Sequence, residues 1–193
     1  MDTFVIEGGR RLDGRLRVNG SKNAALPLMC AALLTDQPLV LRDVPDLADI
    51  RNMQRLLAEL GCLRTREGVD SSPAGQGLNV MTLHSQDLTQ CHARYDIVRT
   101  MRASISTLGP LLARRGHARV SMPGGCAIGD RPVDLHLRGL QALGTEITLD
   151  SGDIVAKAPK GGLRGATIFL GGTFGSTVLG TANVMSAATL AKG

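Results

Sequence analysis

A 78-residue internal repeat constrains this 193-residue chain more than any other feature of the sequence. Three segments rich in Ala, Leu and Met have few charges, begin at polar or Gly-containing turns and end at Leu34, Leu112 and Leu190, which gives a spacing of 78 residues twice. Their composition predicts largely buried helices. A period of this length is typical of repeated supersecondary units that share one core.

The segments after the first two helices repeat as well. Each helix is followed by a short strand that ends at a proline, Pro45 or Pro123, and by an amphipathic helix that ends at Gly61 or Gly144, both read as left-handed caps. Hairpin-like β segments are expected at 4–18, 78–83 and 154–170. The pattern predicts an α/β fold built from units of helix, strand, helix and then strands.

The third unit supplies only its first helix, 177–190, before the sequence stops. The apolar faces of that helix would lack the strand and closing helix that cover them in the other units. We therefore expect a piece of a longer protein with an incomplete domain. A chain that dimerises to complete the fold is the alternative.

Composition narrows the function classes. Only 2% of residues are aromatic and none is Trp, which disfavours a single-strand nucleic-acid binder that stacks bases on aromatic side chains. The net charge of +5 suggests an anionic partner, although a solvated basic surface would give the same value. The 22 Lys and Arg residues are scattered and form no stripe, so we expect a small anion and no nucleic acid.

The start of the sequence has no basic region followed by an apolar run, and no apolar stretch approaches membrane-spanning length. We expect a cytoplasmic protein without a membrane partner. The four cysteines are far apart without CxxC pairing, which argues against a zinc site or a disulfide framework. Cys30, Cys62 and Cys91 are interpreted as structural thiols.

Cys126 has different surroundings, because the loop 122–132 places three glycines around its thiol. This loop contains five residues that the first unit lacks, and its glycines would let the thiol be exposed close to a ligand. Arg131 would favour the thiolate and Asp130 the thiol, so the sequence leaves the pKa open. On these features alone, an incidental cysteine is the more frequent case. No Cys-His-Asn pattern supports a cysteine protease.

Three separated segments carry a resemblance to a known family. They are Asn19-Gly20-Ser21-Lys22-Asn23-Ala24-Ala25-Leu26-Pro27, Thr100-Met101-Arg102-Ala103-Ser104-Ile105, and Pro123-Gly124-Gly125-Cys126 continuing to Arg131-Pro132-Val133-Asp134-Leu135-His136. They resemble the signature segments of UDP-N-acetylglucosamine enolpyruvyl transferases, in the family's order. The resemblance implies about twice this length, with two inside-out α/β barrel-like domains of three units each. Residues 1–21 would form a strand segment of the other domain, and residues 22–193 would form about two and a half units.

The resemblance also implies a reaction. The family transfers the enolpyruvyl group of phosphoenolpyruvate to the 3-hydroxyl of UDP-N-acetylglucosamine, the first committed step of peptidoglycan synthesis, without a metal or organic cofactor. The cysteine that matches Cys126 protonates the methylene carbon of phosphoenolpyruvate, and fosfomycin acts on the family by alkylating it. The general base and several arginines would come from the C-terminal half, which this chain lacks.

The resemblance assigns further residues to ligands. Lys22 and Asn23 would bind phosphoenolpyruvate, and Arg102 would contact the nucleotide sugar and the phosphate region. The other residues implied for UDP-N-acetylglucosamine are Arg131, Pro132, Val133, Asp134, Leu135, Gly175, Ser176, Thr177 and Val178. Gly175 stands where the family more often has a lysine, which weakens the inferred diphosphate contact.

The positions of these residues agree with anion binding. Lys22 and Arg102 lie at helix starts, where the helix dipole disfavours a cation unless an anion is also present. If the units stack their first helices in parallel, three helix N-termini would present free N–H groups on one side. Solvated cations at Lys22 and Arg102, and a helix-start hydrogen bond at Asn23, are the simpler readings. A non-catalytic nucleotide-sugar-binding fragment and the related shikimate 3-phosphate transferase remain alternatives.

Overall fold

The repeat predicted from the sequence is present in the computed structural model, which describes residues 3–70, 78–123, 133–173 and 175–193. The first unit consists of α1 (Lys22–Ala31) continued by η1 (Ala32–Leu34), β1 (Leu39–Arg42), α2 (Ala48–Glu59), β2 (Cys62–Asp70) and β3 (Leu78–Ser85). The second consists of η2 (Arg102–Thr107), α4 (Leu108–Arg115), β5 (His117–Ser121), α5 (Asp134–Ala142), β6 (Glu146–Asp150) and β7 (Asp153–Lys157). Both units therefore have the order helix, strand, helix, strand, strand.

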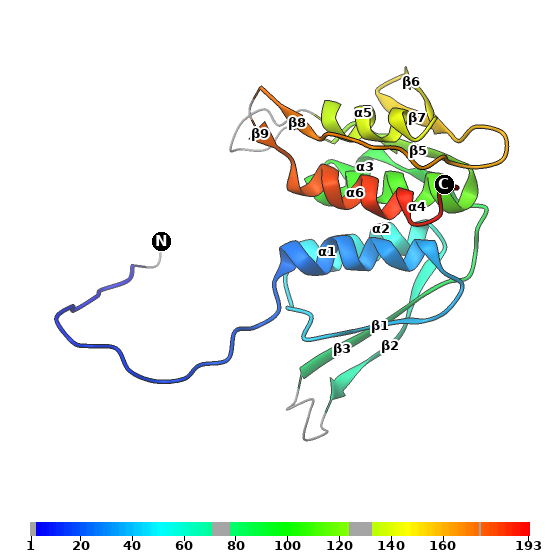
Figure 1. The fold of residues 1–193 in the computed structure, drawn as a ribbon. Coiled ribbons are helices and arrows are strands. Elements are labelled where there is room, and N and C mark those ends of the chain that lie inside the picture. Colours follow the sequence, from blue (N-terminus) through cyan, green and yellow to red (C-terminus); the bar gives the residue numbers. More distant parts are fainter. Residues whose placement is uncertain (1–2, 71–77, 124–132, 174) are drawn as a thin grey trace.

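The two sheets also share one topology. The first has the strand order β1-β3-β2, and the second places β5, β7 and β6 in the same arrangement, with antiparallel pairing throughout these strands. Between the units, β4 (His92–Ala93) adds a parallel edge to β5, and α3 (Tyr95–Val98) follows it. Figure 1 shows the first sheet on one side of the helices and the second unit stacked on the other.

The third unit contributes α6 (Val178–Ala188), which follows the short hairpin of β8 (Gly171–Gly172) and β9 (Gly175–Ser176). It packs against α4, α5, η2 and α1, so it completes a helical layer between the two sheets (Figure 1). Within the described ranges, no helix combines the length and the apolar character that crossing a lipid bilayer requires.

Glycines end the second helix of each unit, as the sequence predicts. Gly61 has φ +76° and Gly144 has φ +90°, the left-handed region that favours glycine. At Gly61 a side chain is excluded for a second reason, because a Cβ would lie 2.2 Å from the Asp87 carbonyl oxygen. The chain therefore turns sharply at these positions and enters the following strand.

Some local predictions are wrong. Residues 4–18 form no strand in this chain, and their apolar side chains are solvent-exposed, with Phe4 at 91%. Between residues 158 and 170 only an isolated bridge from Arg164 to Lys192 replaces the expected strand. In the second unit the predicted helix begins as the 3-10 segment η2 and becomes α-helical only at Leu108. The assignment of residues 1–21 to another domain stays a prediction.

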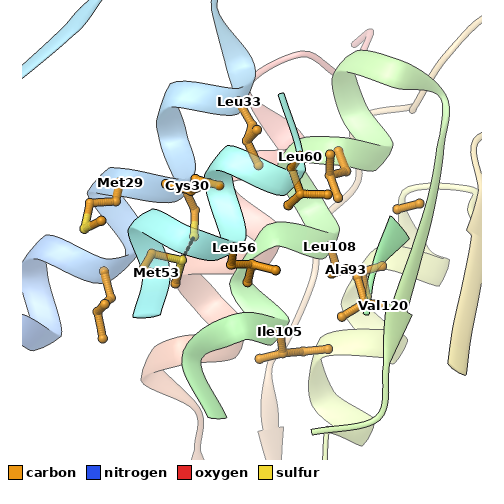
Figure 2. Close-up of a cluster of buried hydrophobic side chains, with 14 of the residues drawn as sticks. Met29, Cys30, Leu33, Met53, Leu56, Leu60, Ala93, Ile105, Leu108 and Val120 are labelled. Carbon is orange, nitrogen blue, oxygen red and sulfur yellow. Dashed lines mark hydrogen bonds between the residues drawn. The ribbon is translucent and has the colours of Figure 1, made fainter. Parts of the chain in front are cut away.

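The core lies where the helices of the two units meet. Figure 2 shows side chains of α1, α2, η2, α4 and β5 filling this space. The Cys30 thiol donates a hydrogen bond to the Met53 sulfur at 3.7 Å, and both residues are buried. Burial raises the pKa of Cys30, and it raises the pKa of Cys62 to about 11. Together with the buried Cys91, these are free, unreactive thiols, which confirms the structural role predicted for them.

Candidate functional site

The three helices α1, η2 and α6, whose first residues are predicted to bind ligands, belong to one layer of the fold. Helix α1 packs against both η2 and α6, and η2 packs against α6. In Figure 1, α1 and α6 begin on the same side of the molecule, next to the long N-terminal segment and the β8–β9 hairpin respectively. A hydrogen bond from Asn183 to Ile105 joins residues that are 78 apart, the repeat period, as expected for equivalent helices packed in parallel.

The start of α1 is held by its cap and by a glycine contact. The Ser21 hydroxyl accepts a hydrogen bond from the Asn23 amide at 3.2 Å. A Cβ at Gly20 would lie 1.8 Å from the Asp43 carbonyl oxygen, so only glycine allows this close approach between the end of β1 and the start of α1. The expected helix-start hydrogen bond is therefore made by the backbone of Asn23, and its side chain is exposed.

Lys22 does not lie free at this helix start. Its ammonium group is 2.7 Å from a carboxylate oxygen of Asp49 in the first turn of α2, with the two side chains 47% and 32% exposed. An exposed ion pair of this kind contributes about 0–1 kcal/mol. A ligand phosphate or carboxylate could therefore take over the contact with Lys22 at small cost, and Asp49 would keep the lysine near the helix start until then.

Arg102 and Asp134 act on one buried histidine. His136 in α5 is 3% exposed, and burial, followed by the positive charge of Arg102, lowers its pKa to about 4, while Asp134 opposes the shift. The structure thus brings together two residues predicted to bind the nucleotide sugar from segments 32 residues apart. Val133, which precedes α5, is buried, and Leu135 lies beside Gly172, so the start of α5 faces the β8–β9 hairpin.

The start of α6 is a capped helix N-terminus. The Thr177 hydroxyl accepts a hydrogen bond from the Gly180 amide at 3.0 Å, while the Val178 side chain is 88% exposed. Ser176 and Gly175 form the exposed strand β9, and Gly175 has φ +92°. Glycine is favoured in that conformation, so a lysine here would strain the backbone.

The remaining predicted site residues, Cys126, Arg131 and Pro132, lie outside the described residues. The chain on either side of them is described: β5 ends at Ser121, and α5 begins at Asp134.

Comparison with known proteins decides the family. The profile of the EPSP synthase family, described as EPSP synthase (3-phosphoshikimate 1-carboxyvinyltransferase), matches residues 6–193. The chain belongs to the EPSP synthase family. The fold expected for an enolpyruvyl transferase is thereby confirmed in its repeated α/β units, and the described strands form no closed barrel.

Within the EPSP synthase family, curated relatives match the whole chain. The proteins from Maricaulis maris and Sphingopyxis alaskensis are 52% and 54% identical to it, and the one from Akkermansia muciniphila is 46% identical. All three are called UDP-N-acetylglucosamine 1-carboxyvinyltransferase. The chain spans only about 43–44% of the length of these relatives.

A solved structure shows the same fold at lower sequence similarity. The crystal structure of the enolpyruvyl transferase NikO from Streptomyces tendae matches with a TM-score of 0.57 and 22% identity. The match covers 78% of this chain and 31% of that chain. This likeness supports the arrangement of the EPSP synthase family fold described above.

Asn183 is a polar residue of this site that the sequence did not lead us to predict. Asn183 is 1% exposed in the middle of α6, and its side chain is within hydrogen-bond distance of η2, α4 and α5. The available signal was an amide within an otherwise small and apolar helix, Val178–Ala188. Because a buried amide needs partners, such a residue indicates a specific tertiary contact.

His136 should make the stability of the chain fall in mildly acidic solution. Its pKa drops from 6.5 to about 4 on folding, so the unfolded chain binds a proton in this range while the folded chain does not. Stability is then fully present above about pH 6.5 and decreases by on the order of 3 kcal/mol as the pH falls toward 4. Urea unfolding at pH 7, 5.5 and 4 measures this decrease.

The matched control is His136→Gln, which has no titrating ring. Its stability should depend less on pH between 6.5 and 4, whereas equal slopes of stability against pH in both proteins would contradict the effect of His136.

Asp153 titrates at lower pH than His136 does in the unfolded chain. Burial raises the pKa of Asp153, but hydrogen bonds from Ser121 and Arg119 outweigh this effect and lower the pKa below its ordinary value.

Proposed function

We propose that the chain is the N-terminal portion of an enzyme that transfers the enolpyruvyl group of phosphoenolpyruvate to the 3-hydroxyl of UDP-N-acetylglucosamine. The observation that carries the proposal is the similarity over the full chain, 46–54% identity, to transferases of that name. In this role the protein would act in the cytoplasm, commit the sugar to peptidoglycan and be a target of fosfomycin.

Phosphoenolpyruvate would bind at the start of α1. Lys22 and Asn23 lie at the first two positions of a capped helix, where backbone N–H groups and the helix dipole favour an anion. The exposed ion pair of Lys22 with Asp49 leaves the ammonium within reach of a ligand. Arg102, whose charge acts on His136, would add a second cation between this position and the nucleotide sugar.

UDP-N-acetylglucosamine would extend along the starts of α5 and α6. Residues 131–135 would hold the uridine, with Asp134 exposed in the first turn of α5 for the ribose or base. The residues 175–178 would hold the diphosphate at the capped start of α6. Because Gly175 replaces the more usual lysine, backbone N–H groups and the hydroxyls of Ser176 and Thr177 would carry this contact.

The addition step requires an acid for the methylene carbon of phosphoenolpyruvate and a base for the sugar hydroxyl. Cys126 would protonate the methylene carbon of phosphoenolpyruvate as the sugar hydroxyl attacks the adjacent carbon, and a base would accept the hydroxyl proton. The resulting tetrahedral ketal then loses phosphate from that carbon and a proton from the new methyl group, which re-forms the carbon–carbon double bond and gives the enolpyruvyl ether. This base and further phosphate ligands would come from the part of the protein outside this chain, together with a second domain that closes over the substrates.

Phosphate-release assays test the proposal. We expect this 193-residue chain to show little or no turnover with both substrates, because the base is proposed to lie outside it, whereas the full-length Maricaulis maris relative provides the positive control. Isothermal titration of the chain with UDP-N-acetylglucosamine then distinguishes a binding fragment from an inert one.

Two outcomes would contradict this assignment. Robust turnover by the chain alone would show that the missing part is unnecessary. Turnover by the full-length protein with shikimate 3-phosphate in place of the nucleotide sugar would favour the activity in the family's description.

A further inference from the structure

The side chain of Asn183 bridges two backbone groups at the η2–α4 junction. The Gly109 amide donates a hydrogen bond to its Oδ1 at 2.8 Å, and its Nδ2 donates to the Ile105 carbonyl at 3.1 Å. In a continuous α-helix, the amide at position 109 would donate directly to the carbonyl at position 105. The side-chain amide of Asn183, which belongs to another repeat unit, thus gives the Gly109 N–H its acceptor. It also adds a second donor to the Ile105 carbonyl, which accepts from the Leu108 amide as well, at the place where the helix changes from 3-10 to α geometry.

The close approach of the two helices depends on glycine. A Cβ at Gly109 would lie 2.3 Å from the Asn183 carbonyl oxygen and 2.6 Å from its Oδ1. Only glycine at this position lets α4 approach α6 closely enough for the side-chain bridge. The contact therefore needs both the glycine of α4 and the asparagine of α6.

The two backbone partners define which way the amide of Asn183 points. An N–H group must face its oxygen and a carbonyl must face its nitrogen, so the opposite orientation would place donor against donor and acceptor against acceptor. The nitrogen has a second hydrogen, and Nδ1 of His136 lies 3.1 Å from it. Nδ1 must therefore accept, and the neutral imidazole carries its hydrogen on Nε2.

The other edge of the His136 ring faces the proposed diphosphate site. A Cβ built at Gly180 would lie 3.3 Å from Cδ2 of His136, the carbon bonded to Nε2, and 2.5 Å from Cγ2 of Thr177. The ring thus lies against the first turn of α6. The charged groups that act on it are Arg102 from η2 and Asp134 from α5, while the sequence of α6 contains no charged residue.

We propose that Asn183 is a positioning residue that joins the three ligand-bearing segments by fixing the η2–α4 junction and holding His136 in its Nε2–H form beside the start of α6. The relevance of Asn183 to substrate binding rests on the proposed function. Its effect on the imidazole of His136 is independent of that function. Through Asn183, the position of Arg102 at the start of η2 and the hydrogen-bonding state of His136 depend on one amide.

Nitrogen-15 NMR of the imidazole rings in the labelled chain tests this proposal directly. At pH 7 the wild-type spectrum should show His136 as the neutral Nε2–H tautomer, and a neutral Nδ1–H form or a protonated ring would overturn the proposal. In Asn183→Asp, the carboxylate can still accept from Gly109 but cannot donate to the ring. Nδ1 should then become protonated, and the pKa of His136 should rise by roughly one unit or more.

Asn79→Asp is the matched control, because it makes the same change on β3. It should leave the tautomer and the pKa of His136 as in the wild type. An unchanged His136 in Asn183→Asp would overturn the proposal, and if that variant does not fold, the wild-type spectrum still decides.

A separate titration of the wild-type chain with UDP-N-acetylglucosamine, followed at the amides of Thr177 and Gly180, reports on the proposed function. No response there, together with the expected tautomer, would contradict the nucleotide-sugar site and leave the positioning role of Asn183 intact. A response together with the Nδ1–H tautomer would support the nucleotide-sugar site and contradict the positioning role of Asn183.

Discussion

Replacement of Cys126 by serine in the full-length protein is expected to lower turnover by about 10²–10⁴-fold, the usual contribution of a general acid. A thiol with an ordinary pKa near 8.5 can give up its proton to a carbon as the transition state forms. A serine hydroxyl is a far weaker acid of similar size, so the variant should lose the proton transfer and keep the shape of the loop. Phosphate release under saturating substrate measures the loss.

The matched control for this prediction is Cys91→Ser, which makes the same change at a buried thiol near Arg115. It should retain turnover, because Cys91 precedes the edge strand β4 and belongs to none of the helix starts of the candidate site. Binding of UDP-N-acetylglucosamine should be nearly unchanged in Cys126→Ser. Full turnover in that variant would remove Cys126 from the role of acid.

The repeat could be read from the sequence because local signals mark its boundaries. Ser21 and Thr177 cap their helices with side-chain hydroxyls, and Gly61 and Gly144 end theirs in the left-handed conformation. These features depend on residues that are close in sequence. The equal spacing of three apolar helices then revealed the larger period.

The sequences of strands β2 and β6 indicate a strand less clearly than the caps indicate the helix ends. Cys62–Asp70 contains four charged residues, and Glu146–Asp150 is short and begins and ends with acids, so neither has the apolar alternation of a half-buried strand. Both are edge strands paired with better candidates, β3 and β7. The segment around Phe4 shows the reverse case: its apolar residues predicted a strand, but within the described ranges no strand pairs with it.

The candidate site also has features that the sequence predicts and contacts that it does not. The helix starts with Lys22, Arg102 and Thr177 followed from the sequence pattern, and their location in one layer followed from the repeat. The ion pair of Lys22 with Asp49 and the bonds of Asn183 could not be predicted, because they join residues 27 to 78 positions apart. Such contacts depend on how the helices cross, and a single sequence does not contain that information.

The arrangement of the helix starts depends on the core between the units, and Leu56→Ala should destabilise this core strongly. Leu56 of α2 is 0% exposed and lies in the centre of the cluster formed with α1 and α4 (Figure 2). Truncation of a buried leucine removes apolar contacts and leaves a cavity, which costs about 2–5 kcal/mol. This is a large part of the roughly 5–15 kcal/mol that stabilises a typical domain.

Leu28→Ala provides the comparison, since it makes the same truncation on α1 at a side chain that is 52% exposed. Its free energy of unfolding should change by no more than about 0.5 kcal/mol. Guanidinium unfolding of both variants measures the difference, and equal losses would show that the α1–α2 interface is not the packed core described here. Because Lys22 of α1 and Asp49 of α2 meet across this same interface, loosening it should also separate the lysine from the carboxylate that holds it at the helix start.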